Sequence, residues 1–375
     1  MKTTISSYWM LLASVALFFS CEKQDVRLHT TIHEDGTCKR EVIYRNVMPQ
    51  EERDSLWGKD STSAPLAPVP ECVNMEGFMG SHTDIGENDT VTTTLEYQEF
   101  KDVKEMCQYT PLQLNGARLK SNANLEKHFR WFYTEYTYTE TFNTVADTFK
   151  LSPTDYADKD VVSYWFTGQP NLLEGLSGGQ ASEKISKMEP FVTRWINDNL
   201  FKMCFDYMVQ HYDSIQNPPV SKEQFVALHD SLPLALLKEG QDIANVNPKE
   251  EFEKFFHSNA YAPFFDEENP LGKGLSEELA HQLNIFWFSV SYSLSMPGTV
   301  VNPGTGVLKD GIIYYPLTGE RLIPGDYTIS ATSRVTNIWA YVVMSLILLI
   351  AIGSFIYRGK EKRMQNGKQI VKKQP

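Results

Sequence analysis

The apolar run near the C-terminus constrains this 375-residue chain more than any other feature. From Ile338 to Tyr357 the sequence reads IWAYVVMSLILLIAIGSFIY, without one charged residue. A helix needs about 20 apolar residues to cross the hydrocarbon core of a bilayer, so this run has the length of a transmembrane helix. Trp339, Tyr341 and Tyr357 lie near its ends, where aromatic side chains meet the membrane interface. We therefore predict one transmembrane helix over residues 338–357.

The residues that follow this run are strongly basic. Residues 358–375 contain one acidic residue, Glu361, and seven basic ones: Arg358, Lys360, Lys362, Arg363, Lys368, Lys372 and Lys373. Lys and Arg beside a span favour the cytoplasmic side of the membrane. The sequence therefore predicts a cytoplasmic tail over residues 358–375 and places the chain before the span outside the cytoplasm.

The N-terminus carries an export signal that agrees with this topology. Lys2 precedes an apolar run, Trp9 to Phe19, which is too short to span a bilayer and is typical of a secretion signal. A small residue then precedes Cys21, and the end of the run resembles a bacterial lipobox, with Phe18 where Leu is usual. We predict a signal peptide over residues 1–20 and an acyl chain on Cys21. The alternative is an ordinary signal peptide followed by an incidental cysteine.

Together the two ends predict a protein of the bacterial cytoplasmic membrane with a periplasmic ectodomain. A spanning helix holds a protein effectively irreversibly, whereas a single acyl chain binds only marginally. The lipid is therefore not needed for retention, and we expect it to hold the start of the folded domain against the bilayer.

Charge limits the ligands of the ectodomain. The chain has 47 acidic and 35 basic residues and a net charge of −12 at pH 7. Because the signal and the tail are basic, the exported part is more acidic than the whole. Such a surface repels phosphate groups, which argues against nucleic acid as a ligand and against broad electrostatic adhesion to anionic lipid.

Strand patterns fill residues 21–150 and 284–334. Residues 26–44 alternate apolar and polar side chains about an Asp35-Gly36 turn, which is a strong hairpin signal. A further strand is expected over residues 91–97, and a short helix within residues 100–109. Near the C-terminus, residues 286–296 place an apolar side chain at every even position, and a last strand near residues 326–331 leads almost directly into the span.

Helical patterns fill residues 151–283, between the two β-rich portions. Pro190 is expected in the first turn of a helix that ends near Tyr212. Ser221 and Gln224 have the spacing of a capping box, and Pro248 indicates another helix start. We therefore predict an α+β fold: an antiparallel β domain built from N- and C-terminal segments, with a helical insertion, plus one C-terminal transmembrane helix.

The most aromatic stretch, residues 128–142, reads HFRWFYTEYTYTETF. Its aromatic residues fall on two parities: Phe129, Trp131 and Tyr133 on one, and Tyr136, Tyr138 and Phe142 on the other. We predict a single strand with a β-bulge near Thr134-Glu135, which would bring both sets to one face. We interpret that face as core, and the alternative is an aromatic platform for a lipid tail or a glycan.

A family resemblance rests on several of these features together. They are the lipoprotein signal, Asp35-Gly36-Thr37, the F-x-D-V-x-E segment from Phe100 to Glu105, Met296-Pro297-Gly298, and the terminal span with its basic tail. In these the chain resembles the LppM-type membrane-anchored bacterial lipoproteins, over its two β portions. The resemblance implies an extracytoplasmic, mostly antiparallel β domain that binds envelope lipid. It implies no site residue.

Residues 174–180, EGLSGGQ, match two well-known motifs. LSGGQ is the signature of ABC-type ATPases, but the Walker A loop that must accompany it does not occur in the chain. Residues 175–179 also fit the G-x-S-x-G nucleophile elbow, which needs a buried strand before the serine. Gly168 and Pro170 break any such strand, so we expect a flexible loop that enters the helical block. A periplasmic serine hydrolase using Ser177 remains the alternative function, with these candidate partners: His211, His229, His257 and His281.

Other chemistry has weak signals in this chain. His29 and His33 share one face of a predicted strand, but no further ligands stand at a recognised metal-site spacing, so we predict no metal and no cofactor. Four cysteines follow Cys21 in the exported part, so disulfides are expected, with three connectivities open: Cys38, Cys72, Cys107 and Cys204.

These observations favour a cell-envelope lipoprotein with a binding or scaffolding role and no enzymatic activity. The expected partner is an envelope lipid or a protein of the same membrane. A sensor that signals through the span is a further class, but a tail of 18 residues is too short to form a domain.

Overall fold

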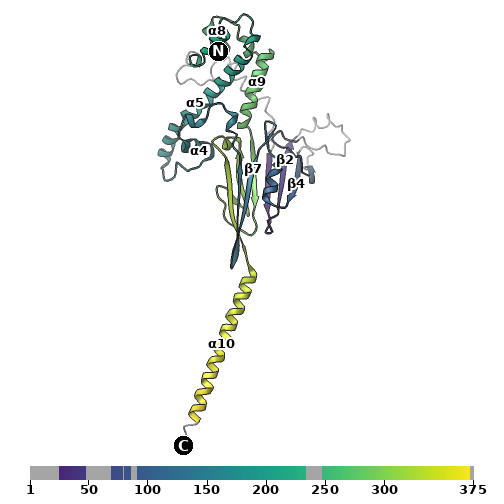
Figure 1. The fold of residues 1–375 in the computed structure, drawn as a ribbon, viewed down its shortest axis with the longest axis vertical. Coiled ribbons are helices and arrows are strands. Elements are labelled where there is room, and N and C mark those ends of the chain that lie inside the picture. The colour runs from purple at the N-terminus through teal and green to yellow at the C-terminus, as the bar shows by residue number, and fades with distance from the viewer. Residues whose placement is uncertain (1–24, 48–68, 79, 86–90, 234–246, 372–375) are drawn as a thin grey trace, which may run out of the picture.

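The computed structural model describes residues 25–47, 69–78, 80–85, 91–233 and 247–371. The predicted signal peptide and Cys21 lie outside these residues. Along the long axis of the molecule, a helical block, a β domain and a C-terminal helix follow one another (Figure 1). The fold is α+β, as the sequence predicts.

The larger sheet of the described residues has seven strands in the order β11-β12-β9-β1-β2-β4-β3. Their bounds are β1 Asp25–Ile32, β2 Cys38–Val47, β3 Gly80–Ile85, β4 Val91–Phe100, β9 Ser289–Ser295, β11 Val307–Lys309 and β12 Ile312–Thr318. Neighbouring strands are antiparallel except β1 and β9, which are parallel. Because β1 and β9 come from opposite ends of the chain, the sheet is built from both terminal segments, as predicted.

The smaller sheet packs on the larger one to form a sandwich with one hydrophobic core. Its strand order is β10-β13-β8-β7, with bounds β7 Ser121–Arg130, β8 Tyr133–Phe142, β10 Thr299–Asn302 and β13 Tyr327–Thr336. A two-stranded sheet joins β5 Gln113–Leu114 and β6 Ala117–Arg118. Short 3-10 turns link the elements: η1 Ala146–Thr148, η2 Pro153–Asp155, η3 Tyr212–Ser214, η5 Ala262–Phe265, η6 Asn284–Phe286 and η7 Gly319–Leu322.

Local signals at the N-terminal side are confirmed. β1 and β2 form the predicted hairpin, and the backbone N–H and hydroxyl of Thr37 donate to the Asp35 carboxylate at 2.9 and 2.7 Å. Gly36 has φ +97°, a conformation that favours glycine. The predicted short helix is α3, Val103–Gln108. Its N-cap is Asp102, whose carboxylate accepts from the backbone N–H of Glu105 at 2.8 Å.

The predicted bulge near Thr134-Glu135 is wrong. β7 and β8 are separate antiparallel strands, joined by a two-residue turn at Trp131 and Phe132. Each strand of a hairpin has its own alternation of side chains, so the change of parity needs no extra residue. The second aromatic set is buried, as its interpretation as core predicts: Tyr136, Tyr138 and Phe142. By contrast, Phe129 and Trp131 are exposed.

Between the β portions lies the predicted helical block, with α4 Lys159–Thr167, α5 Gly178–Gln210, α6 Lys222–Ala227, α8 Pro248–Phe256 and α9 Pro270–Leu283. Ser221 caps α6 and Pro248 is the first residue of α8, as predicted. Pro190 does not begin its helix, because α5 starts well before it and contains it. The proline lacks a backbone N–H, so α5 loses one hydrogen bond at this point. The burial of Met188 and Phe191 nearby stabilises this part of the helix and compensates for that loss.

The long helix α5 belongs to two separate cores. Its first half buries Met188, Phe191 and Trp195 in the core of the β sandwich. Its second half packs with α6, α8 and α9 in another core, which we call the outer core: Met203, Phe205, Met208, Tyr212, Ile215, Phe225, Leu232, Phe252, Tyr261, Phe264, Leu275 and Leu279. The helical block is thus joined to the sandwich through one continuous helix.

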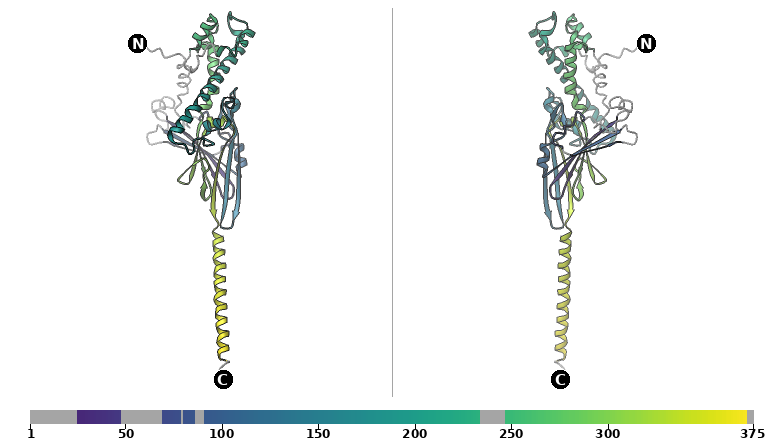
Figure 2. Two further views of the ribbon diagram at one scale, coloured as in Figure 1. Left: turned by 90° about the vertical axis from the view of Figure 1, so that its left-hand side faces the viewer. Right: turned by 90° about the vertical axis from the view of Figure 1, so that its right-hand side faces the viewer.

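The C-terminal helix α10, Ile338–Val371, follows β13 after the single residue Asn337. Residues 338–361 form the one helix of the described chain that is long and apolar enough to cross a membrane, and they are almost entirely exposed. Two opposite side views, each turned by 90° from Figure 1, show α10 continuing the long axis of the sandwich (Figure 2). The helical block therefore lies at the end of the sandwich opposite to α10.

Candidate functional site

The strand β8 carries an unexpected charge into the sandwich core. Its alternate residues face inward: Thr134, Tyr136, Tyr138, Glu140 and Phe142. Glu140 is therefore buried by the same alternation that buries its aromatic neighbours, and its side chain has no exposed surface. An isolated carboxylate at such a position would cost several kcal/mol, about as much as a small domain's whole stability, so it needs a partner.

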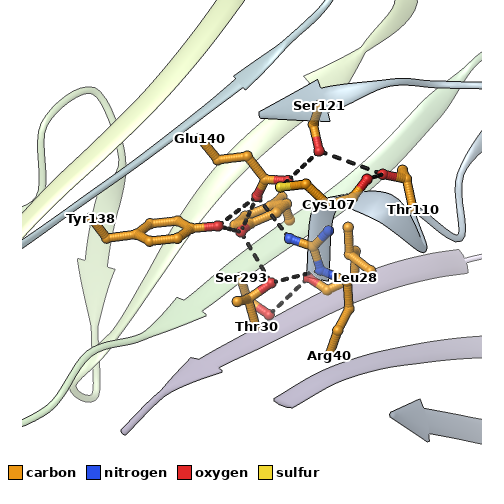
Figure 3. Close-up of polar contacts among 10 residues, drawn as sticks. Leu28, Thr30, Arg40, Cys107, Thr110, Ser121, Tyr138, Glu140 and Ser293 are labelled. Carbon is orange, nitrogen blue, oxygen red and sulfur yellow. Dashed lines mark hydrogen bonds and ion pairs between the residues drawn. The ribbon is translucent and has the colours of Figure 1, made fainter. Parts of the chain in front are cut away.

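That partner comes from the opposite sheet. Arg40 on β2 is also without exposed surface, and its Nη2 donates to Glu140 Oε2 at 2.8 Å. Its Nε donates to Thr30 Oγ1 on β1 at 3.3 Å. The ion pair thus joins the seven-stranded sheet to the four-stranded sheet through the middle of the core (Figure 3).

Hydroxyl groups complete the surroundings of the carboxylate. Tyr138 and Tyr292 lie with their hydroxyls 2.7 Å from Glu140 Oε2, and the Ser121 hydroxyl donates to Oε1 at 2.8 Å. The Cys107 thiol, from α3, is 4.0 Å from Oε1. We call these residues, with Arg40 and Thr30, the Glu140 cluster.

The electrostatics keep the pair charged. Burial alone would raise the pKa of Glu140, but Arg40 and the hydroxyl donors outweigh it, so this pKa is lowered. Burial would likewise lower the pKa of Arg40, and the Glu140 carboxylate raises it instead. Burial and the adjacent carboxylate raise the pKa of both Tyr138 and Tyr292, so these phenols stay neutral and act as donors. A buried carboxylate with this many donors is a structural tie and not a general base.

Ser177, the candidate nucleophile, lies elsewhere and caps a helix. Its backbone N–H and its hydroxyl both donate to Gln180 Oε1, at 3.0 and 2.8 Å. The preceding residues form a turn in which Gly175 has φ +75°, and no strand leads into Ser177. EGLSGGQ is therefore the start of α5, since it combines a glycine turn with a serine cap. The sequence predicts a flexible loop here, but Gly178 and Gly179 belong to the first turn of α5, and only the exposed residues before Ser177 form a turn.

The candidate histidines and cysteines are dispersed. His29 is half-buried and lies 2.8 Å from the Ser293 hydroxyl, whereas His33 is exposed beyond the end of β1. In the part of the chain that the structure describes, no group of three potential ligands could hold a metal ion.

The expected disulfides do not form, and the four cysteines among the described residues are free. Cys38 lies on β2, Cys72 in the loop before β3, Cys107 on α3 and Cys204 on α5. Burial raises the pKa of the thiols to about 12 for Cys38, 11 for Cys72 and 12 for Cys204. Such thiols stay protonated and poorly reactive at neutral pH.

Sequence reasoning did not find the Glu140 cluster. The available signal was the parity of β8, in which Glu140 falls on the same side as Tyr136, Tyr138 and Phe142. A charged residue on an otherwise aromatic face indicates a buried ionic partner, but nothing local identifies Arg40, which is 100 residues away.

Comparison of the chain with protein-family models, with curated proteins and with solved structures finds no match in any of the three.

Proposed function

We propose that this protein is a membrane-anchored binding or scaffolding protein of the bacterial cell envelope, without enzymatic activity. One observation carries the proposal: the β sandwich separates the apolar helix α10 from the helical block. The core of the sandwich is tied by the ion pair between its sheets, and α5 extends from that core into the outer core. The helical block lies at the end of the sandwich opposite to α10, so the tilt of the sandwich sets its distance from the membrane.

The proposed orientation places the sandwich and helical block in the periplasm and the basic residues after Tyr357 in the cytoplasm. We retain the resemblance to LppM-type lipoproteins as part of this proposal. The partner is a protein of the same membrane or an envelope lipid, because the acidic chain disfavours nucleic acid. External protease added to spheroplasts should remove the ectodomain and spare the tail. A reporter fused after Pro375 that is active in the periplasm would overturn the orientation.

The strand register limits where an acyl chain on Cys21 can lie. After β9 the chain enters β10, whose first residue pairs with Arg334, four residues before α10. The end of β9 is therefore near α10, and because β1 is parallel to β9, the end of β1 is near α10 as well. The start of β1 at Asp25 is therefore at the end of the sandwich away from α10. Four residues of extended chain span at most about 14 Å, whereas β1 alone rises about 26 Å. The lipid would share a leaflet with α10 only if the sandwich reclined on the bilayer.

Energy transfer from a dye on the helical block to acceptors on the membrane surface measures this arrangement. If the acyl chain holds the sandwich against the bilayer, Cys21→Ser should increase the distance from the dye to the membrane. An unchanged distance would show that the lipid does not set the tilt of the sandwich.

Photo-crosslinking in intact cells tests the binding role. A benzophenone amino acid replaces Phe255 on α8, which is 37 % exposed, or Tyr314 on β12, which is 39 % exposed. Both residues are aromatic and similarly exposed, but Phe255 lies on the helical block and Tyr314 on the sandwich. We expect a discrete adduct with a membrane protein or an envelope lipid from position 255 and none from position 314. Equal adducts from both positions, or none from 255, would contradict a partner at the helical block.

A further inference from the structure

The tip of the β7–β8 hairpin is fastened to the start of α10. The Asn337 side chain donates through Nδ2 to the carbonyl oxygens of Arg130 and Trp131 at 2.9 and 3.3 Å. Its backbone N–H donates to the carbonyl of Phe132 at 2.9 Å, and its Oδ1 accepts from the Thr134 hydroxyl at 3.1 Å. The carbonyls of the turn, which in most hairpins face water, are thus bonded to the residue that precedes α10.

Aromatic rings from the same tip pack on the first turn of α10. The Phe129 ring stacks on Trp339, with centroids 6.2 Å apart and planes at 6°. Trp131 meets the same ring edge-on at 5.3 Å, and Phe132 lies 5.0 Å from Tyr341. Despite these contacts the side chains at the tip are not buried: Phe129 and Trp131 are 57 % and 46 % exposed.

The depth of these aromatic rings in a membrane follows from the length of the apolar run over residues 338–357. Residues 338–357 form about 30 Å of helix, which matches the hydrocarbon core. Trp339 and Tyr341 then lie at the outer lipid interface, where aromatic belts occur. Side chains that touch them must lie at the same depth. Arg130, exposed beside the turn, would reach lipid phosphates at this level.

We propose that the hairpin tip is a second membrane contact, which inserts Phe129, Trp131 and Phe132 into the lipid interface beside α10. The partner of this surface is the bilayer itself. The inference rests on the proposed anchoring by α10 but adds a site on the folded domain. Two features suit the tip to this environment. Its aromatic surface is apolar, and the turn carbonyls, which would cost free energy in lipid without a hydrogen bond, accept from Asn337. With two contacts the sandwich cannot swivel freely on the helix.

Quenching of tryptophan fluorescence by brominated lipid tests the proposal. The full chain is reconstituted in phosphatidylcholine vesicles with or without bromine near the glycerol end of the acyl chains. Trp131→Phe, Trp339→Phe and Trp287→Phe are compared with the natural sequence. Trp287 is the matched control, because it is 58 % exposed and lies just before β9, at the end of the sandwich away from α10. Near-UV circular dichroism checks that each variant is folded.

We expect Trp131→Phe and Trp339→Phe each to lower the share of emission that brominated lipid quenches, and Trp287→Phe not to lower it. Quenching of Trp339 without quenching of Trp131 would overturn the second contact and leave the anchoring intact. Quenching of neither would overturn both. If Trp287 were quenched as strongly as Trp131, the contact would not be specific to the tip and the proposal would fail. Iodide in the aqueous phase gives an independent check, since lipid should shield Trp131 from it.

Discussion

The β sandwich and the outer part of the helical block differ in what fills their cores. The sandwich core surrounds a charged pair whose two residues come from different sheets. The buried residues of the outer core carry no charge, and half of them are aromatic; Phe225, for example, lies nearly parallel to Phe205 with centroids 5.0 Å apart. Ionic hydrogen bonds are directional and expensive to leave unmade, whereas apolar rings accept several packings. The sandwich core therefore depends on the one strand arrangement that brings Arg40 to Glu140, whereas the outer core depends mainly on apolar packing.

The largest expected effect comes from breaking the ion pair. Glu140→Ala leaves the Arg40 guanidinium charged and unpaired in the core, and should lower the free energy of unfolding by about 3 to 5 kcal/mol. Denaturant unfolding of the full chain in detergent micelles measures it by tryptophan fluorescence, because Trp195 is buried in the sandwich core and none of the described tryptophans belongs to the outer core. The loss should therefore appear mainly in the fluorescence transition.

Two variants sharpen this result. Glu135 on the same strand pairs with Arg334 at 2.8 Å on the surface, and Glu135→Ala should cost at most about 1 kcal/mol. Replacing both partners, as Arg40→Met with Glu140→Leu, should recover most of the loss, because no charge is left buried. Equal losses for Glu140→Ala and Glu135→Ala would mean that burial does not matter to this pair.

A cavity in the outer core should lower the free energy of unfolding somewhat less, and the loss should appear in the helical block and not in the sandwich. Phe225 is fully buried, and Phe225→Ala should cost about 3 kcal/mol. Because the two cores are separate clusters, we expect the helical far-ultraviolet signal to shift while the tryptophan transition stays close to that of the natural chain. A matched shift of both signals would show that the two cores unfold as one unit.

The buried ion pair should also make the stability of the sandwich depend on pH in the acid range. The pKa of Glu140 is lowered in the folded state, so the pair contributes stability that is fully present above the unfolded carboxyl pKa of about 4.3. This contribution is lost as the pH falls through the lower folded pKa. Stability measured in steps from pH 7 to pH 3 should therefore fall more steeply for the natural chain than for the double variant Arg40→Met with Glu140→Leu. Parallel profiles would contradict the assigned role of Glu140.

The smallest effect is expected at the exposed start of α5, at Ser177. Ser177→Ala removes a helix cap and should cost about 1 kcal/mol or less, seen as faster hydrogen exchange in the first turn of α5. Ser221→Ala, which removes the equivalent serine before α6, is the matched control. Cellular function should survive both changes. Loss of function from Ser177→Ala in a folded, membrane-bound protein would favour the hydrolase over the binding role.

Several features of this protein could be predicted from the sequence because the residues that determine them are neighbours. The apolar run at 338–357, the Asp35-Gly36 turn and the starts of α6 and α8 each depend on a few consecutive residues. Where two local signals competed, the prediction failed. Pro190 was a strong start signal, but the serine cap at Ser177 lies upstream and begins the helix first. Likewise, the turn at Trp131 and Phe132 contains neither Gly nor Asn, so the hairpin was not recognised.

Other features were decided only by the tertiary structure, because they join residues far apart in the chain. The pairing of Arg40 with Glu140, the parallel contact of β1 with β9, and the bonds from Asn337 to the hairpin tip all bring distant segments together. Each depends on the register of strands across two sheets, and a hydrophobic pattern specifies which face a residue occupies but not which residue it meets. Local patterns therefore sufficed to predict that an apolar helix follows a β domain with a helical insertion. Long-range packing decided that a buried charge ties the sheets and that an aromatic hairpin accompanies the helix.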